Sequence, residues 1–298
     1  MAGGDAAGRP GSGLHYMVGA AFFFSLMTLA VKLAGRTVPS SEIVLVRNVL
    51  GLVFTVILLR RAKVFGWGNR KDLLLLRGFA GLGGLLCFFY AAVRLPLADV
   101  TVIHYINPVL TAILAAGVLG ERLRWREVGA LAMSLAGVVL VAQPSFLFGG
   151  EARLDPAVVG IAVLGASFSA VAYTTVRKLR ETEHPLIVVF YFPLVATPAS
   201  IPIMAPEAVW PGPGAWLLLL AVGVFTQIAQ VLLTKGLHAE PAGRAMATSY
   251  IQIVFAAVWG VAFFGEFPNP LAVGGAVLVM AGVLIVAGRP GTHRSRMG

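Results

Sequence analysis

Apolar stretches of about 20 residues recur along the whole chain, separated by segments that are polar, charged or rich in proline. A helix of about 20 apolar residues is long enough to cross the hydrocarbon core of a bilayer. The pattern predicts an all-α integral membrane protein with ten transmembrane helices. We place them at 14–35, 40–60, 71–93, 97–119, 125–143, 157–177, 185–204, 213–236, 241–264 and 270–288. Most joints are short, so successive helices must be antiparallel neighbours.

A second regularity is a repeat within the chain. Residues 96–142 recur without a gap at 241–287, at a constant offset of 145, with fourteen of the forty-seven positions identical. The matches include Pro96/Pro241, Tyr105/Tyr250 and Gly120-Glu121/Gly265-Glu266. Apolar composition would produce some Ala and Val matches, but it would not readily align Pro, Tyr and Gly-Glu in one register.

The repeat predicts the domain organisation. We expect a tail at 1–13, a first five-helix repeat at 14–143, a second at 157–288 and a second tail at 289–298. Because five is an odd number, the second copy must enter the membrane from the opposite side, which makes an inverted repeat. Secondary transporters are commonly built in this way, with the substrate site at the repeat interface.

Composition and charge agree with a membrane protein and set its orientation. Charged residues make up 12% of the chain, against about 25% in soluble proteins. If the joints are assigned alternately to the two sides, seventeen Lys and Arg fall on the side of both termini and four on the other. The seventeen are Arg9, Arg60, Arg61, Lys63, Arg70, Lys71, Arg122, Arg124, Arg126, Arg177, Lys178, Arg180, Lys235, Arg244, Arg289, Arg294 and Arg296, and the four are Lys32, Arg36, Arg94 and Arg153. The bias predicts an inner (plasma) membrane protein with both termini in the cytoplasm.

Several functions are excluded by what the sequence lacks. The net charge of +10 reflects topology, because no exposed domain gathers basic residues for nucleic acid. No Walker-type loop occurs, so we expect no ATP hydrolysis. The single cysteine, Cys87, and the single histidine within a span, His104, do not suggest a metal site. No catalytic pair lies at membrane depth, so we expect neither an enzyme nor a cofactor.

The pattern of motifs resembles a known family. Five plus five inverted helices, a Gly-Glu after the fourth helix of each half and an A-G-V-x-x-V-A end to each fifth helix are similar to the EamA branch of the drug/metabolite transporter superfamily. Within that branch, the segments 105–108 and 249–250 resemble exporters of aromatic amino acids. The resemblance implies a central cavity lined by the first, third and fourth helices of each half, with the fifth helices at the periphery. The family often has proline in both fourth helices, whereas this chain has Pro108 and Ile253.

Polar and aromatic side chains within spans are the candidates for binding substrate, because burying an unpaired polar group in lipid costs several kcal/mol. They are His104, Tyr105, Asn107 and Thr111 on the fourth helix, Gln227 and Gln230 on the eighth, Ser249, Tyr250 and Gln252 on the ninth, Tyr173 on the sixth and Arg47 on the second. The alternative is that they hold the bundle together through hydrogen bonds between helices.

Other residues suggest gating or coupling. Pro108, Gly83, Gly84 and Tyr90 are candidates for a gate or hinge, although small residues also mark close helix packing and Tyr90 also suits the aromatic belt. His104 is either a proton carrier or a neutral hydrogen-bonding group.

The basic residues within spans have their own alternatives. Arg47 either binds a substrate carboxylate or pairs with Glu42. Arg77 lies near the end of its helix, and we expect it to snorkel to the surface.

The sequence therefore predicts an exporter of small amphipathic metabolites, especially aromatic or other apolar amino acids, that works by alternating access. No carboxylate lies in the middle of a span, so we expect neutral or zwitterionic substrates and no coupling ion. One alternative is a proton-coupled exporter that uses His104. Another is a carrier of polar solutes, sugar derivatives or drug-like compounds; a polar-solute carrier would need denser positive charge in the cavity than Arg47 alone. A lipid scramblase or structural membrane protein is the remote alternative.

Overall fold

The computed structural model describes residues 12–64, 66–149, 154–207 and 209–288, and within these ranges it contains helices and no strands. Arg9, Arg153, Arg289, Arg294 and Arg296 lie outside the described residues, as do both tails except Ser12 and Gly13. Ten helical segments are long and apolar enough to cross a membrane. The prediction of an all-α protein with ten spans is confirmed.

The helices of the first half are α1 (Ser12–Ala34), α2 (Ser40–Arg61), α3 (Lys71–Ala92), α4 (Leu97–His104), α5 (Asn107–Leu119) and α6 (Trp125–Ala142). A short helix, α7 (Ser145–Phe148), joins the halves. Those of the second half are α8 (Pro156–Leu179), α9 (Pro185–Met204), the 3₁₀ turn η1 (Ala205–Glu207), α10 (Pro213–Ala239), α11 (Ala242–Ser249), α12 (Ile251–Phe264) and α13 (Pro270–Ala287).

Two predicted spans differ from the structure. The spans at 97–119 and 241–264 were each expected as one helix, but each is interrupted near its middle, between α4 and α5 and between α11 and α12. By contrast, α9 continues through Pro193, Pro198 and Pro202. Proline is tolerated there because neighbouring helices can satisfy the freed backbone groups.

Local sequence signals set several helix ends. Gly120 and Gly265 end α5 and α12 with φ of 68° and 65°, the left-handed conformation that glycine adopts without steric cost. Asp155 and Asn269 cap the starts of α8 and α13 with side-chain oxygens. Such caps satisfy backbone N–H groups that have no partner within the helix.

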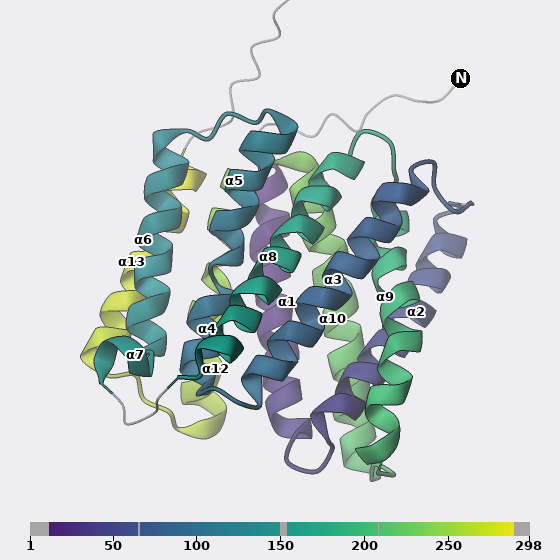
Figure 1. The fold of residues 1–298 in the computed structure, drawn as a ribbon, viewed down its shortest axis with the longest axis horizontal. Coiled ribbons are helices and arrows are strands. Elements are labelled where there is room, and N and C mark those ends of the chain that lie inside the picture. The colour runs from purple at the N-terminus through teal and green to yellow at the C-terminus, as the bar shows by residue number, and fades with distance from the viewer. Residues whose placement is uncertain (1–11, 65, 150–153, 208, 289–298) are drawn as a thin grey trace, which may run out of the picture.

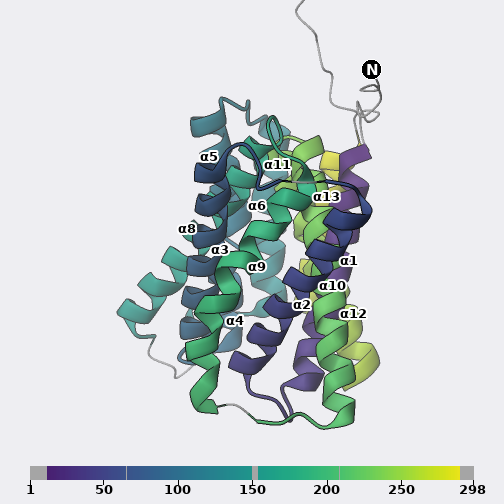
Figure 2. The ribbon, with the colours of Figure 1, turned by 90° about the vertical axis from the view of Figure 1, so that its right-hand side faces the viewer.

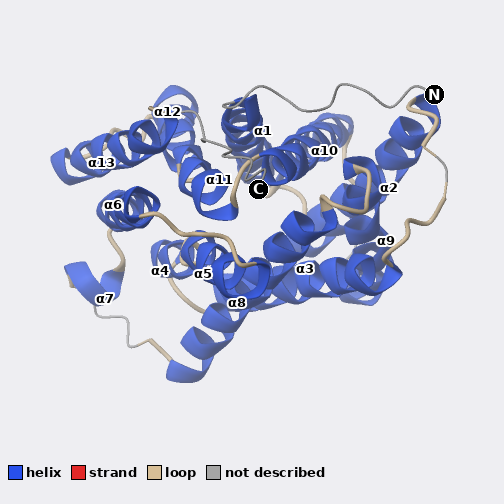
Figure 3. Ribbon diagram, turned by 90° about the horizontal axis from the view of Figure 1, so that it is seen from above, coloured by secondary structure: helices blue, strands red, loops and turns tan. Residues whose placement is uncertain are grey.

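The two halves correspond element by element. The bounds of α4 and α11, and those of α6 and α13, differ by 145 at both ends, and the other equivalent helices match within a few residues. The packing follows the same rule: α1 packs on α10 as α8 packs on α3, while α2 packs on α9 and α6 on α13 (Figure 3). These contacts are those an inverted repeat requires, and the two-fold relation itself stays a prediction.

The chain alternates between two faces of the bundle. We call the face at which α1 begins and α13 ends the terminal face, and the other the distal face; α8 begins at the distal face (Figure 1). Helices α2, α3 and α9 lie along one side of the bundle (Figure 2). The pair α6 and α13 forms one end of it (Figure 3), which agrees with the peripheral place expected for the fifth helices.

Close packing depends on small residues at two helix pairs. A Cβ atom added at Gly84 would lie 2.6 Å from Ser169 Oγ and 3.2 Å from the Gly165 carbonyl on α8. One added at Gly137 of α6 would lie 2.5 Å from the Gly275 carbonyl on α13. Small residues let membrane helices approach closely, which replaces the hydrophobic driving force that lipid does not supply.

Candidate functional site

The break between α4 and α5 follows from Pro108. Proline has no N–H, so the carbonyl of His104, four residues earlier, loses its helical donor. The Asn107 side chain replaces it, because its Nδ2 donates to the His104 carbonyl at 2.8 Å. The helix is interrupted here, and the freed carbonyl stays satisfied inside the membrane, where water is not available.

The second half has a break at the equivalent position without a proline. Between α11 and α12 the Ile253 N–H donates to the Tyr250 carbonyl in a tighter three-residue turn, a geometry that often marks a local interruption in a helix. Ser249 Oγ donates to the Met246 carbonyl at 2.7 Å and satisfies another acceptor near the end of α11. The helix is therefore interrupted even though Ile253 stands where the first half has Pro108.

The two breaks meet through a pair of tyrosines. The rings of Tyr105 and Tyr250 are stacked, with centroids 5.7 Å apart and an interplanar angle of 23°. The Tyr250 hydroxyl donates to the Tyr105 carbonyl at 2.8 Å, and Tyr250 is fully buried. The helix break of the first half therefore contacts the helix break of the second half through these two tyrosines.

A second feature of the interior is a cluster of positive charge from Arg77, which is buried, and Arg47, which is half-buried. The guanidiniums of Arg47 on α2 and Arg77 on α3 both face the ring of Phe192 on α9, at 5.7 and 5.2 Å from its centroid. Arg77 Nη2 also donates to Gln230 Oε1 at 3.3 Å. Tyr173 interacts electrostatically with both guanidiniums and with Tyr105. The tyrosine pair and the arginines therefore belong to one region of the interior.

A small cavity opens against this cluster. It is lined by Arg47, Asn48, Gly51, Val189, Phe192, Pro193, Thr226, Gln227 and Gln230. Its volume is about 10 Å³, roughly the room for one water molecule. The helices around it must separate before an organic molecule can enter, so the structure shows a closed arrangement.

Several polar atoms at the cavity have no protein partner. They are Nε of Arg47, Oδ1 of Asn48 and Oγ1 of Thr226, with Nε of Arg77 beside them. Asn48 and Thr226 are 1% and 5% exposed. Buried polar groups nearly always have a partner, and an unpaired one calls for an explanation such as a ligand or water.

Two expectations for the basic residues are corrected. Arg77 does not snorkel: it is 2% exposed, because α9 and α10 cover the part of α3 on which it lies. The cavity therefore adjoins two positive charges rather than Arg47 alone. Glu42 does not pair with Arg47 either, since its carboxylate accepts from the Val209 N–H at 3.1 Å.

The remaining candidates on the fourth and eighth helices are placed differently. Gln227 lines the cavity and donates to Thr55 Oγ1 at 2.9 Å. The ring of His104 packs edge-on against Phe88, with centroids 4.9 Å apart. Thr111 is buried and donates to the Asn107 carbonyl within its own helix at 2.7 Å.

The other candidates lie away from the cavity wall. Gln252 is half-buried at the start of α12. The backbone at Gly83 and Gly84 approaches α8 closely, with Phe168 facing Gly83. Tyr90 is exposed, and the Arg94 guanidinium lies 3.7 Å from its ring centroid.

Several residues of this candidate site were not among those predicted from the sequence: Asn48, Thr55, Phe192 and Thr226. Arg77 was expected at the surface. Asn48 and Thr55 are polar positions within a predicted span, the same signal that identified the other candidates. Phe192 carried no such signal. It stands at the repeat equivalent of Arg47, 145 residues later.

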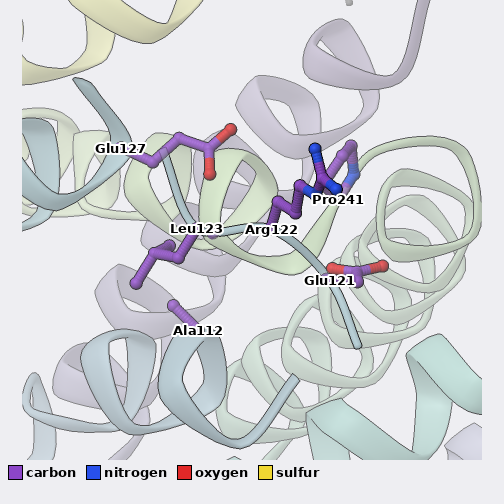
Figure 4. A pocket seen from close by; sticks show the side chains of 7 residues that line it. Ala112, Glu121, Arg122, Leu123, Glu127 and Pro241 are labelled. Carbon is purple, nitrogen blue, oxygen red and sulfur yellow. The ribbon is translucent and has the colours of Figure 1, made fainter. Parts of the chain in front are cut away.

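An ion-pair network closes the bundle at the terminal face. Arg177 at the end of α8 donates to Glu121 Oε1 at 2.5 Å and to the carbonyls of Leu237 and His238 at 2.8 and 3.0 Å. Glu121 Oε2 accepts from the N–H of Ala242 at the start of α11. Figure 4 shows Glu121 at the second small cavity, whose other lining residues are Ala112, Arg122, Leu123, Glu127, Pro241 and Gly243.

The distal face has an equivalent ion pair. Lys32 Nζ on α1 lies 2.6 Å from Glu266 Oε1. In the repeat, Lys32 corresponds to Arg177 and Glu266 to Glu121, each at an offset of 145. The distal pair is exposed, at 49% and 57% of the side-chain surface, whereas the Arg177–Glu121 pair is buried, at 4% and 16%. Each face of the bundle is thus closed by contacts between the two halves.

The fold and the site together define a multi-pass membrane transporter. Within the described residues no group of His, Cys, Asp or Glu is placed to hold a metal ion. The model of the EamA-like transporter family matches residues 11–143 and 157–288, and the chain belongs to this family. The resemblance seen in the sequence is confirmed.

Two relatives agree with this assignment, and a solved structure supports the fold. The chain is 36% identical over 277 residues to the pseudopaline exporter CntI of Pseudomonas aeruginosa, covering 93% of this chain and 96% of the relative. It is 29% identical to solute carrier family 35 member G1 of Homo sapiens, covering 91% and 78%. A crystal structure shares the fold with a TM-score of 0.82 at 20% identity, covering 92% and 96%. These names indicate a transporter rather than an enzyme.

Proposed function

We propose that this chain is an inner-membrane secondary exporter of small amphipathic metabolites, with aromatic or other apolar amino acids as the first candidates. Both termini would lie in the cytoplasm, and the two inverted halves would open the central cavity to one side and then to the other. The direction of export is supported by the relative that is named an exporter. The tyrosine pair would stack an apolar group of the substrate.

One observation carries this proposal: buried polar atoms without partners line a closed cavity beside the junction of the two broken helices. A purely structural protein would gain nothing from leaving Asn48 Oδ1 and Thr226 Oγ1 unpaired. A substrate that enters when the helices separate would satisfy them. Within the described residues the cavity lining contains no carboxylate, so we propose transport without a coupling ion. The alternative is proton coupling through His104.

Transport by purified protein in liposomes tests the proposal. Labelled phenylalanine, leucine and other amino acids are offered with and without a pH gradient. Uptake that does not depend on the gradient supports an uncoupled carrier, whereas accumulation only with the gradient implicates His104. No uptake of any amino acid or amino-acid derivative would contradict the proposed substrates.

Two substitutions test the site. Tyr105→Ala removes one ring of the stacked pair, and Gln230→Ala removes a cavity-lining amide; each should lower the transport rate at least tenfold with membrane insertion unchanged. Gln143→Ala, at a loop of the distal face, is the matched control and should transport normally. Wild-type rates for both site variants would contradict the location of the site.

A further inference from the structure

Two arginines at the cavity, Arg77 buried and Arg47 half-buried, have no counter-charge among the described residues. Charged side chains are almost never fully buried unless they are paired, and an uncompensated buried charge destabilises a protein strongly. Yet among the described residues neither Arg47 nor Arg77 forms an ion pair. Their partners are the Phe192 ring and, for Arg77, the neutral amide of Gln230.

Ten carboxylates whose side chains the structure describes have partners elsewhere in the fold. Glu121, Glu240, Glu266, Asp72 and Glu181 pair with other basic residues. Glu42, Asp99, Glu127, Asp155 and Glu183 accept hydrogen bonds from backbone N–H groups in other parts of the fold. None of these ten carboxylates supplies the counter-charge of the cluster, which leaves that role to a bound anion.

A zwitterion leaves the net positive charge of this site unchanged. Its carboxylate would neutralise one guanidinium, but its ammonium would add a positive charge to a site that already has two. The carbonyls freed at the first helix break cannot compensate, because Asn107 and Tyr250 already donate to those of His104 and Tyr105. The face of Phe192, the ring beside the cavity, is occupied by the guanidiniums.

We infer that the transported substrate is a small organic anion with at least two acidic groups, bound between Arg47 at the cavity wall and Arg77 beside it. Guanidinium groups bind carboxylates and phosphates alike in bidentate geometry, so the shared chemistry is a pair of oxyanions. The unpaired Oδ1 of Asn48 suits an N–H donor of the same molecule. The inference rests on the proposed exporter function and changes its first candidate substrates, because an anion with two acidic groups takes the place of the aromatic and other apolar amino acids.

Three α-amino acids of similar size test the inference. Glutamine is neutral overall, glutamate has the same shape with a second carboxylate, and O-phosphoserine carries a phosphate instead. Thermal unfolding of the purified full chain is measured with each compound, since a ligand that binds only the folded state raises the unfolding temperature. Transport of the same three is measured in liposomes alongside phenylalanine.

We expect glutamate, O-phosphoserine or both to stabilise the protein and to be transported, at least tenfold better than glutamine. An effect of glutamate alone would identify dicarboxylates as the substrate class, and an effect of O-phosphoserine alone would identify phosphate esters. Transport of glutamine and phenylalanine without any effect of the two acidic compounds would overturn the inference while leaving the proposed function intact. Absence of transport for all four compounds would overturn both, which separates the two failures.

Substitutions assign the effect to the arginines. Arg47→Gln and Arg77→Gln should each abolish the protein's preference for the acidic compound over glutamine. Arg47→Lys should keep part of this preference, because lysine retains the positive charge but lacks the bidentate N–H donors of arginine. Arg61→Gln, exposed at the end of the same helix as Arg47, is the matched control and should keep the preference. An unchanged preference for the acidic compounds in both Arg47→Gln and Arg77→Gln would overturn the inference. We expect both variants to fold, because each removes an unpaired charge.

Discussion

The ion pair between Glu121 and Arg177 offers the sharpest test of the packing between the two halves. Replacing Glu121 by Gln removes the negative charge and leaves a guanidinium whose side chain is 4% exposed. Breaking a buried pair in this way typically costs about 3–5 kcal/mol. Arg177 keeps two backbone carbonyls as partners and Glu121 is 16% exposed, so we expect the lower end, about 3 kcal/mol.

The equivalent pair at the distal face is the internal control. Lys32 and Glu266 form the same contact between the halves, but both are about half-exposed. Exposed pairs contribute about 0–1 kcal/mol, so Glu266→Gln should cost well under 1 kcal/mol. Raising the ionic strength should weaken the distal pair and leave the buried one nearly unchanged, because solvent ions screen exposed charges far more effectively.

The assay is reversible unfolding in mixed micelles, which gives the free energy of unfolding for each variant. The double variant of Glu121→Gln with Arg177→Gln isolates the pair itself, because it removes both charges at once. We expect the double variant to be less destabilised than the sum of the single variants. Equal costs for Glu121→Gln and Glu266→Gln would refute the reasoning, since burial would then have no effect.

Three further predictions follow from single contacts. Tyr250→Phe removes the hydroxyl that bonds the Tyr105 carbonyl and should lower the free energy of unfolding by about 1 kcal/mol, measured in the same micelles; an unchanged value would show that the bond contributes nothing. Gly84→Val should disrupt the contact of α3 with α8 and lower the yield of folded protein, whereas Gly117→Val, which faces open space, should be tolerated; equal yields would count against close packing. Burial and, secondarily, Lys235 lower the pKa of His184, so stability should fall as the pH drops below about 6.5; thermal unfolding between pH 8 and 5 checks this, and His184→Asn should make the dependence weaker.

The ten spans could be predicted because membrane thickness imposes a length and a composition on every crossing. The break in the first half has a visible cause in Pro108. The break in the second half has none, because a turn around Tyr250 needs no special residue and depends on the tertiary contact with Tyr105. The sequence repeat itself suggested the pairing of these tyrosines, and the structure brings them into contact.

The candidate site was only partly predictable for a similar reason. Arg77 lies six residues after the start of α3, and distance along one helix suggested that its side chain could reach the surface. Whether it can depends on the helices that cover it, and Phe192 and Gln230 come from α9 and α10. Depth along a helix can be read from sequence, whereas the neighbours across the bundle cannot.

The polar groups of the cavity have no equivalents in the other half. At an offset of 145, Arg47 corresponds to Phe192, Arg77 to Val222, and Gln230 to Leu85. In the proposed mechanism the two halves are therefore alike as scaffold and unlike as binding surface, so exchanging their conformations would not recreate the same surroundings for a bound molecule. A carrier without a coupling ion alternates between an orientation open to one face and an orientation open to the other. Detailed balance links the ratio of its substrate affinities in these two orientations to their resting populations. Such a protein cannot concentrate its substrate, yet it can saturate at different concentrations on the two sides, which makes efflux and influx unequal in rate at the same concentration.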